Sequence, residues 1–233
     1  MIKMVVFDMA GTTVNENNVV YKTLQHAINE KGFDFSLDQV LAEGAGREKL
    51  EAIKNVLWVY AKNQDNALAD QIYQQFMVEL DRAYDTADIE PVENALELFD
   101  QLRKRKILVV LNTGYNAKTA GMLLSKMQWK IGEQFDGLVT ASDVKNNRPK
   151  PDMIFNAMAE FTIEDPKQVV KVGDSIVDIE EGKNAGCALT IGITTGAHTL
   201  QQLRQANPDY IIDDLIELLG ILDRTAIEVQ SPV

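Results

Sequence analysis

Cysteine, histidine and long apolar runs are scarce in this sequence. Its 233 residues include one cysteine, Cys187, and two histidines. One cysteine cannot form a disulfide within the chain, which fits a reducing compartment. No apolar stretch approaches the length of a transmembrane helix, and the chain begins with an expected strand rather than a signal peptide. We therefore expect a soluble, cytoplasmic protein.

Positive charge is also scarce. The formal net charge is −12, and lysines and arginines form no block. This charge argues against nucleic acid and anionic membrane surfaces as partners. A small anionic substrate stays possible, because one metal ion and two arginines can reverse the field locally. The composition is that of an ordinary globular protein, and the length suits one domain with an insertion.

Apolar, β-branched runs alternate with helical stretches over most of the chain. The expected strands are 4–7, 107–111, 138–141, 169–173, 189–193 and, more weakly, 210–212. The expected helices are 91–106, 116–127, 151–161, 175–186 and 213–222. Strands that alternate with helices in this way indicate an α/β fold with a doubly wound parallel sheet. The last residues, 225–233, are expected to form a loosely held tail.

One segment interrupts the alternation. Residues 16 to about 87 contain no convincing strand and repeat apolar residues at helical spacing, for example at Val20, Leu24 and Ile28. We interpret 16–87 as a helical cap domain inserted into an α/β core that comprises 1–15 and 88–233. The expected hinges lie near 14–16 and 87–91.

Polar residues gather where the expected strands end. The first strand ends at Asp8, the next in 112–115, a third leads to 147–151, and a fourth ends in 173–175, with Asp178 one helical turn later. Ligands of open parallel sheets bind outside the carboxyl ends of the strands. Each segment alone could be a turn or a helix cap. Their joint position predicts one catalytic crevice.

The residue types suggest matched roles in that crevice. Asp8 as nucleophile would form an aspartyl-phosphate. Asp8, the main-chain carbonyl of Ala10 and Asp174 could hold Mg²⁺. Asp178 would orient a metal-bound water without itself being a ligand of the metal. Three groups would bind the remaining phosphate oxygens. They are the amides of Gly11 and Thr12 in the loop after Asp8, the Thr113 hydroxyl with Gly114 in the loop after the second strand, and the Arg148 guanidinium.

The motifs DMAGT, TGY, RPKP and GDSIVD, with a helical insert after the first, resemble the haloacid dehalogenase superfamily with a helical cap. The resemblance is strongest to its phosphonoacetaldehyde hydrolase (phosphonatase) branch, which also has alanine at the position of Ala10 and arginine at that of Arg148. Lys150 is the rival for the role of Arg148. The resemblance implies a Mg²⁺-dependent hydrolase with a Rossmann-like core.

Two positions restrict the reaction. Other phosphatases of the superfamily carry a general acid where this chain has Ala10, and a positioned acid contributes about 10²–10⁴-fold. Phosphonatases instead form a Schiff base through a cap lysine. In the stretch EGAGREKLEAIK, Arg47 aligns with that lysine, and a guanidinium cannot act as an amine nucleophile. Lys49, two positions on, is expected to point elsewhere, so phosphonatase activity is not expected.

Arg47 has two interpretations. It could hold the distal group of a substrate, as in related sugar-phosphate enzymes, or pair with Glu51 on a helix surface. Tyr115 could contact substrate or only pack.

We expect a hydrolase that releases phosphate from a small phosphorylated or phosphonylated metabolite, as a monomer or a homodimer. A metal-independent dehalogenase and a degenerate fold used for binding are the alternatives.

Overall fold

The computed structural model describes residues 1–230, and residues 231–233 of the expected tail lie outside this range. A six-stranded sheet forms its centre, in the order β5-β4-β1-β6-β7-β8. All neighbouring strands in it are parallel. The strands are β1 (Met4–Asp8), β4 (Leu108–Thr113), β5 (Gly137–Thr140), β6 (Val169–Gly173), β7 (Leu189–Ile193) and β8 (Tyr210–Ile212). The predicted doubly wound α/β fold is confirmed.

Both faces of the sheet are buried, as the unalternating apolar runs predict. Along β1, Val5 and Phe7 belong to the larger apolar cluster, whereas Met4 and Val6 belong to a second cluster on the other face. The covering helices are α5 (Ala95–Lys104), α6 (Ala117–Lys126), α7 (Asp152–Glu160), α8 (Ile176–Ala185), α9 (Leu200–Gln205) and α10 (Glu217–Gln230). Short 3₁₀ turns occupy Ala141–Asp143 and Pro166–Gln168.

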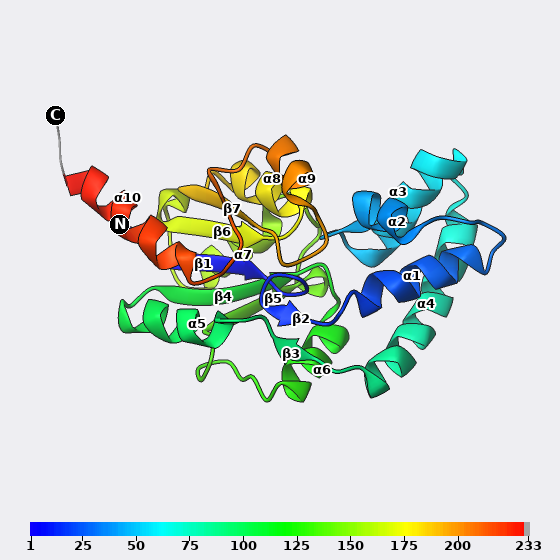
Figure 1. Cartoon of the computed structure of the whole chain (residues 1–233), viewed down its shortest axis with the longest axis horizontal. Coiled ribbons are helices and arrows are strands. Elements are labelled where there is room, and N and C mark those ends of the chain that lie inside the picture. Colours follow the sequence, from blue (N-terminus) through cyan, green and yellow to red (C-terminus); the bar gives the residue numbers. More distant parts are fainter. Residues whose placement is uncertain (231–233) are drawn as a thin grey trace.

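Four helices follow one another between the first and second strands of the sheet in chain order. They are α1 (Val19–Asn29), α2 (Leu37–Gly44), α3 (Lys49–Ala61) and α4 (Asn66–Thr86). Their spaced apolar residues, such as Leu24, Ile53 and Phe76, are fully buried. Figure 1 shows these helices together at one end of the sheet, on the side away from α10. We propose that they form the cap domain.

The two connections between helices and sheet pair with each other. β2 (Val14–Asn15) and β3 (Glu90–Pro91) form a short antiparallel ribbon in which Val14 lies opposite Pro91. The expected helix from Pro91 was therefore wrong at its start: α5 begins at Ala95, because 90–91 are extended and the Val92 amide donates to the Thr13 carbonyl at 3.0 Å. The expected hinges thus lie side by side.

Strand register brings the polar strand ends to one edge. Asp8 lies opposite Asn112 in the pairing of β1 with β4, and Thr113 lies opposite Thr140 in the pairing of β4 with β5. Asp174 follows β6 directly. None of the helices described in residues 1–230 is both long and apolar enough to cross a membrane.

Candidate active site

Asp8 lies at the carboxyl end of the central strand β1 and is 4% exposed. Its Oδ1 accepts a hydrogen bond from Arg148 Nη1 at 2.6 Å. Among the described residues, no hydrogen bond reaches Asp8 Oδ2, so this oxygen can attack an electrophile. The guanidinium of Arg148 is buried, whereas Lys150 is exposed, and this excludes Lys150 as the cation beside Asp8.

Arg148 belongs to a group of buried charges that we name the core cluster: Asp8, Arg148, Lys171, Asp178 and Glu181. Arg148 lies 2.9 Å from Asp178 Oδ1 through Nη1 and 3.0 Å from Glu181 Oε2 through Nε. Lys171 Nζ lies 2.9 Å from Asp178 Oδ1 and 3.3 Å from Glu181 Oε2. Asp178 and Glu181, both on α8, therefore each face two cations.

Asn112 completes this arrangement from β4. Its amide nitrogen donates to Glu181 Oε2 at 2.9 Å, and its side-chain oxygen accepts from Lys171 Nζ at 2.6 Å. Its main-chain carbonyl accepts from Arg148 Nη2 at 2.8 Å. These bonds fix the direction of the guanidinium, because three of its nitrogens are held by different strands and helices.

Opposite charges outweigh burial at Asp178 and Arg148, whereas at Asp8 burial dominates and raises the pKa above its ordinary value. Burial raises the pKa of Asp178, but the charges of Arg148 and Lys171 lower it further, so the net shift is downward. Burial lowers the pKa of Arg148, and the charges of Asp178, Glu181 and Asp8 raise it above its ordinary value. Both groups are therefore charged over the whole physiological pH range.

Three buried carboxylates could hold a metal ion. Asp8, Asp174 and Asp178 each offer an oxygen, and these oxygens lie within 4.8 Å of one another. Burial and the negative charge of Asp8 raise the pKa of Asp174 well above its ordinary value. A hard divalent cation with oxygen ligands would relieve this repulsion. The donor set fits the predicted Mg²⁺. It includes Asp178, which the sequence analysis expected to contact metal-bound water rather than the metal itself.

The loops around Asp174 approach it closely. A Cβ on Gly11 would lie 2.5 Å from Asp174 Oδ2, and one on Gly196 would lie 2.0 Å from it. Gly11 also has a φ of +86°, which only glycine adopts easily. Thr12 Oγ1 donates to Asp174 Oδ1 at 3.5 Å, and the Ala197 amide donates to Oδ2 at 2.6 Å. Ala10, between Asp8 and this loop, pairs with Val14 in an isolated bridge.

The loop after β4 meets the cap. Thr113 is buried, and its Oγ1 accepts from the Tyr115 amide at 3.2 Å. A Cβ on Gly114 would lie 2.6 Å from the Arg47 carbonyl oxygen and 3.1 Å from that of Gly46. Gly46 in turn accepts from Arg148 Nη1 at 3.4 Å. The cap loop that contains Gly46 and Arg47 therefore rests on the crevice.

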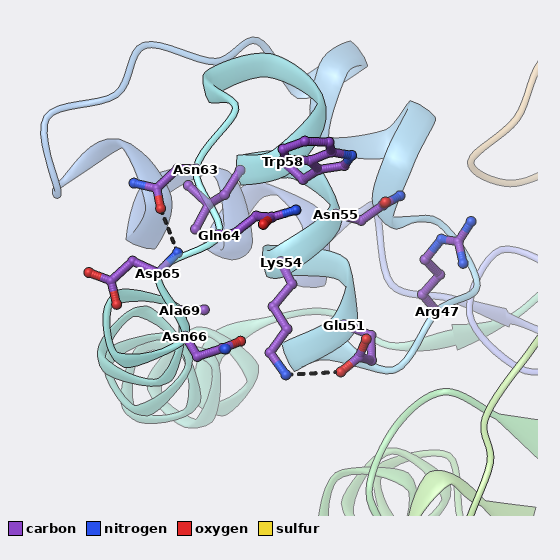
Figure 2. Close-up of a pocket in the computed structure, with 11 residues that line it drawn as sticks. Arg47, Glu51, Lys54, Asn55, Trp58, Asn63, Gln64, Asp65, Asn66 and Ala69 are labelled. Atoms are coloured by element: carbon purple, nitrogen blue, oxygen red, sulfur yellow. Dashed lines mark hydrogen bonds and ion pairs between the residues drawn. The ribbon is translucent and has the colours of Figure 1, made fainter.

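The Arg47 side chain lies on the cap. Its Nε donates to the Glu43 carbonyl at 3.0 Å, and it lines a cap pocket of about 400 Å³ with Trp58, Asn63 and Asp65. Figure 2 shows Arg47 at the edge of this pocket, opposite Asn63 and Asp65. Its expected alternative partner, Glu51, pairs instead with Lys54 at 3.1 Å.

Lys49 differs from expectation, because it points toward the core. The first residue of α3, it is 7% exposed, and its Nζ donates to the Arg47 carbonyl at 2.8 Å. The ammonium also lies 5.1 Å from the ring centroid of Tyr21 and 5.2 Å from that of Tyr115. Burial lowers the pKa of Lys49 to about 8, while the charge of Asp8 opposes this shift.

Tyr115 is buried and reaches the cap. Its hydroxyl lies 2.8 Å from that of Tyr84 on α4, which donates to Glu16 Oε2 at 3.2 Å. Tyr21 accepts from the Gly46 amide at 3.0 Å. We name Glu16, Tyr21, Lys49, Tyr84 and Tyr115 the cap enclosure.

Sequence reasoning missed Lys171, Glu181, Glu16 and the position of Lys49. Two signals were available. A lysine inside the apolar run VVKVG needs buried partners, and Glu181 follows Asp178 at the i+3 spacing that places both on one helix face. Glu16 and Lys49 gave no such signal.

Known proteins are similar to this chain over most of its length. The family model described as haloacid dehalogenase-like hydrolase matches residues 5–191. Phosphonoacetaldehyde hydrolase of Latilactobacillus sakei is 30% identical over 95% of each chain. That of Parabacteroides distasonis is 32% identical over 85% of this chain and 78% of its own.

Among solved structures, the fold resembles a phosphonoacetaldehyde hydrolase like protein from Oleispira antarctica. The TM-score is 0.81 at 23% identity, and the match covers 96% of this chain and 92% of the other. The protein is therefore a hydrolase of the haloacid dehalogenase-like family, to which this chain belongs through its phosphonatase-like branch.

Proposed function

We propose that the protein is a Mg²⁺-dependent hydrolase that releases phosphate from a small phosphorylated or phosphonylated metabolite through an aspartyl-phosphate on Asp8. The observation that carries this proposal is the Asp8 carboxylate, held through one oxygen by Arg148 beside two further carboxylates. Asp8, Asp174 and Asp178, with the Ala10 carbonyl, would hold the ion. When bound, Mg²⁺ would neutralise charge between the carboxylate and the phosphoryl group.

Each residue around the phosphorus atom would have a separate role in phosphoryl transfer. Asp8 Oδ2 attacks, while Arg148 holds Asp8 Oδ1 and presents a positive charge to the phosphoryl oxygens. The Thr113 hydroxyl, the Gly114 loop and the amides of Gly11 and Thr12 bind the remaining oxygens. Water then hydrolyses the acyl phosphate and restores Asp8.

Two cap cations are candidates for the part of the substrate remote from phosphorus. We favour Lys49 over Arg47, because Lys49 is buried and Asp8 is the largest of the opposite charges acting on it. Arg47 lines a cap pocket with residues of α3 and the start of α4. The substrate would be small and would carry a carbonyl or anionic oxygen near the phosphorus.

Lys49 also supports a second candidate function, hydrolysis of the carbon–phosphorus bond in phosphonoacetaldehyde. A buried amine with a pKa of about 8 is partly neutral near pH 7 and can attack an aldehyde. The imine that forms would let the carbon leave phosphorus without a separate acid. This candidate is the phosphonatase activity that the alignment of Arg47 with the cap lysine argued against.

Phosphate release with Mg²⁺ tests both candidates. The substrates are acetyl phosphate, a panel of phosphate monoesters, and phosphonoacetaldehyde. Asp8→Asn should lower kcat by about 10⁴-fold or more on every active substrate, because the nucleophile is lost. Turnover by Asp8→Asn at the wild-type rate would refute the aspartyl-phosphate.

The matched pair Lys49→Met and Arg47→Met separates the cap cations. If phosphonoacetaldehyde is hydrolysed, borohydride should trap a substrate adduct on Lys49, seen as a mass increase of the peptide that contains it. Loss of activity in Arg47→Met with normal activity in Lys49→Met would mean that Arg47, and not Lys49, holds the part of the substrate remote from phosphorus.

A further inference from the structure

The cap enclosure contains a hydrogen-bonded chain that crosses from the hinge to the crevice. Glu16 directly follows β2, Tyr84 lies on α4, and Tyr115 follows the Thr113–Gly114 loop of the core. The Tyr84 hydroxyl lies 3.2 Å from Glu16 Oε2 and 2.8 Å from the Tyr115 hydroxyl. Three residues from three separate segments are thus joined through their polar ends.

All three links of this chain are closed to bulk water. Glu16 is 3% exposed, Tyr84 is fully buried and Tyr115 is 3% exposed. Burying an ionised carboxylate without a close cation costs free energy of folding. A buried carboxyl group at a hinge therefore suggests a functional role. Among the described residues no cation forms an ion pair with Glu16; Oε2 accepts only from the Val20 amide at 2.9 Å and from Tyr84.

The charged and titratable groups that face Glu16 come from each packed element. They are Tyr21 on α1, Lys49 on α3, Tyr84 on α4 and Tyr115 beside the crevice. Burial raises the pKa of Glu16 to about 7, although the Val20 amide, the Tyr84 hydroxyl and the charge of Lys49 lower it. Glu16 can therefore both release and regain a proton near neutral pH.

The Tyr115 end of the chain adjoins the loop after β4, which borders the crevice. The Tyr115 amide is bound to Thr113, and its ring faces the Lys49 ammonium, on which Asp8 is the largest opposite charge. Ala10 leaves the usual acid position of the family without a titratable group.

We propose that Glu16 holds the proton that Ala10 cannot supply and delivers it through Tyr84 and Tyr115 to the departing oxygen of the substrate. This inference rests on the proposed function. It assigns Tyr115 as the catalytic residue that touches the leaving group, and Glu16 and Tyr84 as residues that act through it.

The step is balanced. As Asp8 Oδ2 bonds to phosphorus, the bond from phosphorus to the leaving oxygen breaks, and that oxygen takes the Tyr115 hydroxyl proton. Tyr115 takes a proton from Tyr84, and Tyr84 takes one from Glu16, which becomes a carboxylate. In the acting form Glu16 is protonated and donates to the Tyr84 hydroxyl; the bond in which Tyr84 donates to Glu16 Oε2 is that of the resulting carboxylate. Water then attacks the acyl phosphate, and its proton returns along the same chain to Glu16.

Two small substrates distinguish proton delivery by Glu16 from a purely structural role of this residue. Acetyl phosphate expels a carboxylate, which needs no proton, whereas ethyl phosphate expels an alkoxide, which does. Glu16→Gln keeps the shape and the hydrogen bonds but carries no transferable proton. We expect it to lower kcat on ethyl phosphate about 10²-fold or more, and on acetyl phosphate less than about threefold.

Tyr84→Phe and Tyr115→Phe interrupt the chain and should show the same selectivity. Tyr60→Phe is the matched control, since it removes a cap hydroxyl on α3 outside the chain and should leave both substrates unaffected. In the wild type, kcat/KM for ethyl phosphate should fall as pH rises through about 7, because Glu16 must be protonated to act. Glu16→Gln should lose that limb.

Each other outcome overturns the proposal. Equal losses on both substrates would mean that Glu16 only supports the fold. Turnover of acetyl phosphate but not ethyl phosphate by the wild type would mean that no proton is delivered. Retained acetyl phosphate turnover in Asp8→Asn would instead refute the proposed function, and failure of the wild type on both substrates would overturn both.

Discussion

Asp178 and Arg148 of the core cluster are as buried as Glu16 and Lys49 of the cap enclosure, yet their pKa values shift in the opposite directions. In the core cluster, Arg148 and Lys171 each lie within 3.3 Å of Asp178 and Glu181. Opposite charges there lower the pKa of Asp178 and raise that of Arg148. Asp178 and Arg148 are therefore charged at neutral pH.

The cap enclosure holds one acid and one amine among three tyrosines. Because no ion pair joins them in the described part of the chain, burial dominates, and the pKa of Glu16 rises to about 7 while that of Lys49 falls to about 8. Burial alone therefore does not decide protonation; the number of opposite charges enclosed with a group does. The first region is suited to binding a charged group, the second to exchanging protons.

The largest effect is expected when the core cluster loses one cation. Lys171→Met leaves Asp178 and Glu181 with Arg148 alone, and an uncompensated buried charge costs about 3–5 kcal/mol. Urea unfolding at neutral pH measures this loss. Lys118→Met is the control, because its pair with Asp81 is exposed and should contribute only about 0.5 kcal/mol. Similar losses in both variants would mean that the buried ion pairs of the core cluster matter no more to stability than an exposed pair does.

An intermediate effect is expected from pH in the cap enclosure. Because burial raises the pKa of Glu16 from 4.5 to about 7, the folded state binds its proton more tightly than the unfolded state. Stability is therefore lost as pH rises from about 4.5 to about 7, by up to about 3 kcal/mol for this group.

Glu16→Gln should remove that part of the loss, so the variant should gain on the wild type as pH rises. Unfolding free energies measured at several pH values give the difference. Glu97→Gln, at an exposed position of α5, is the control and should follow the wild type. A constant offset between Glu16→Gln and the wild type would mean that folding does not raise the pKa of Glu16.

The smallest effect is expected where the two regions touch. Gly114→Ala would place a Cβ 2.6 Å from the Arg47 carbonyl oxygen, which must push the cap loop away from the crevice. We expect kcat/KM for acetyl phosphate to fall about tenfold, because small displacements at a reacting centre are costly. Gly121→Ala on α6 meets nothing within 4 Å and should keep turnover while stabilising the helix by about 0.5–1 kcal/mol.

Much of the core could be predicted because it depends on local patterns. The apolar run before Asp8 predicted β1, and the carboxyl ends of parallel strands must meet at one edge, so Asp8, Thr113 and Asp174 were brought together correctly. Arg148 was chosen over Lys150, and in the structure Arg148 is buried against Asp8 while Lys150 is exposed. The start of α5 was misplaced, because Pro91 pairs with Val14 through a contact distant in sequence.

The sequence by itself determined the strands, the edge at which they end and the kinds of groups found there. Only the tertiary structure decided which cap cation faces Asp8, and how Glu16 and Lys49 titrate. Their surroundings come from α1, α3, α4 and the loop after β4, and desolvation depends on all of these packing together. A periodic pattern is a property of neighbours in the chain, whereas a pKa is a property of everything that excludes water from the group.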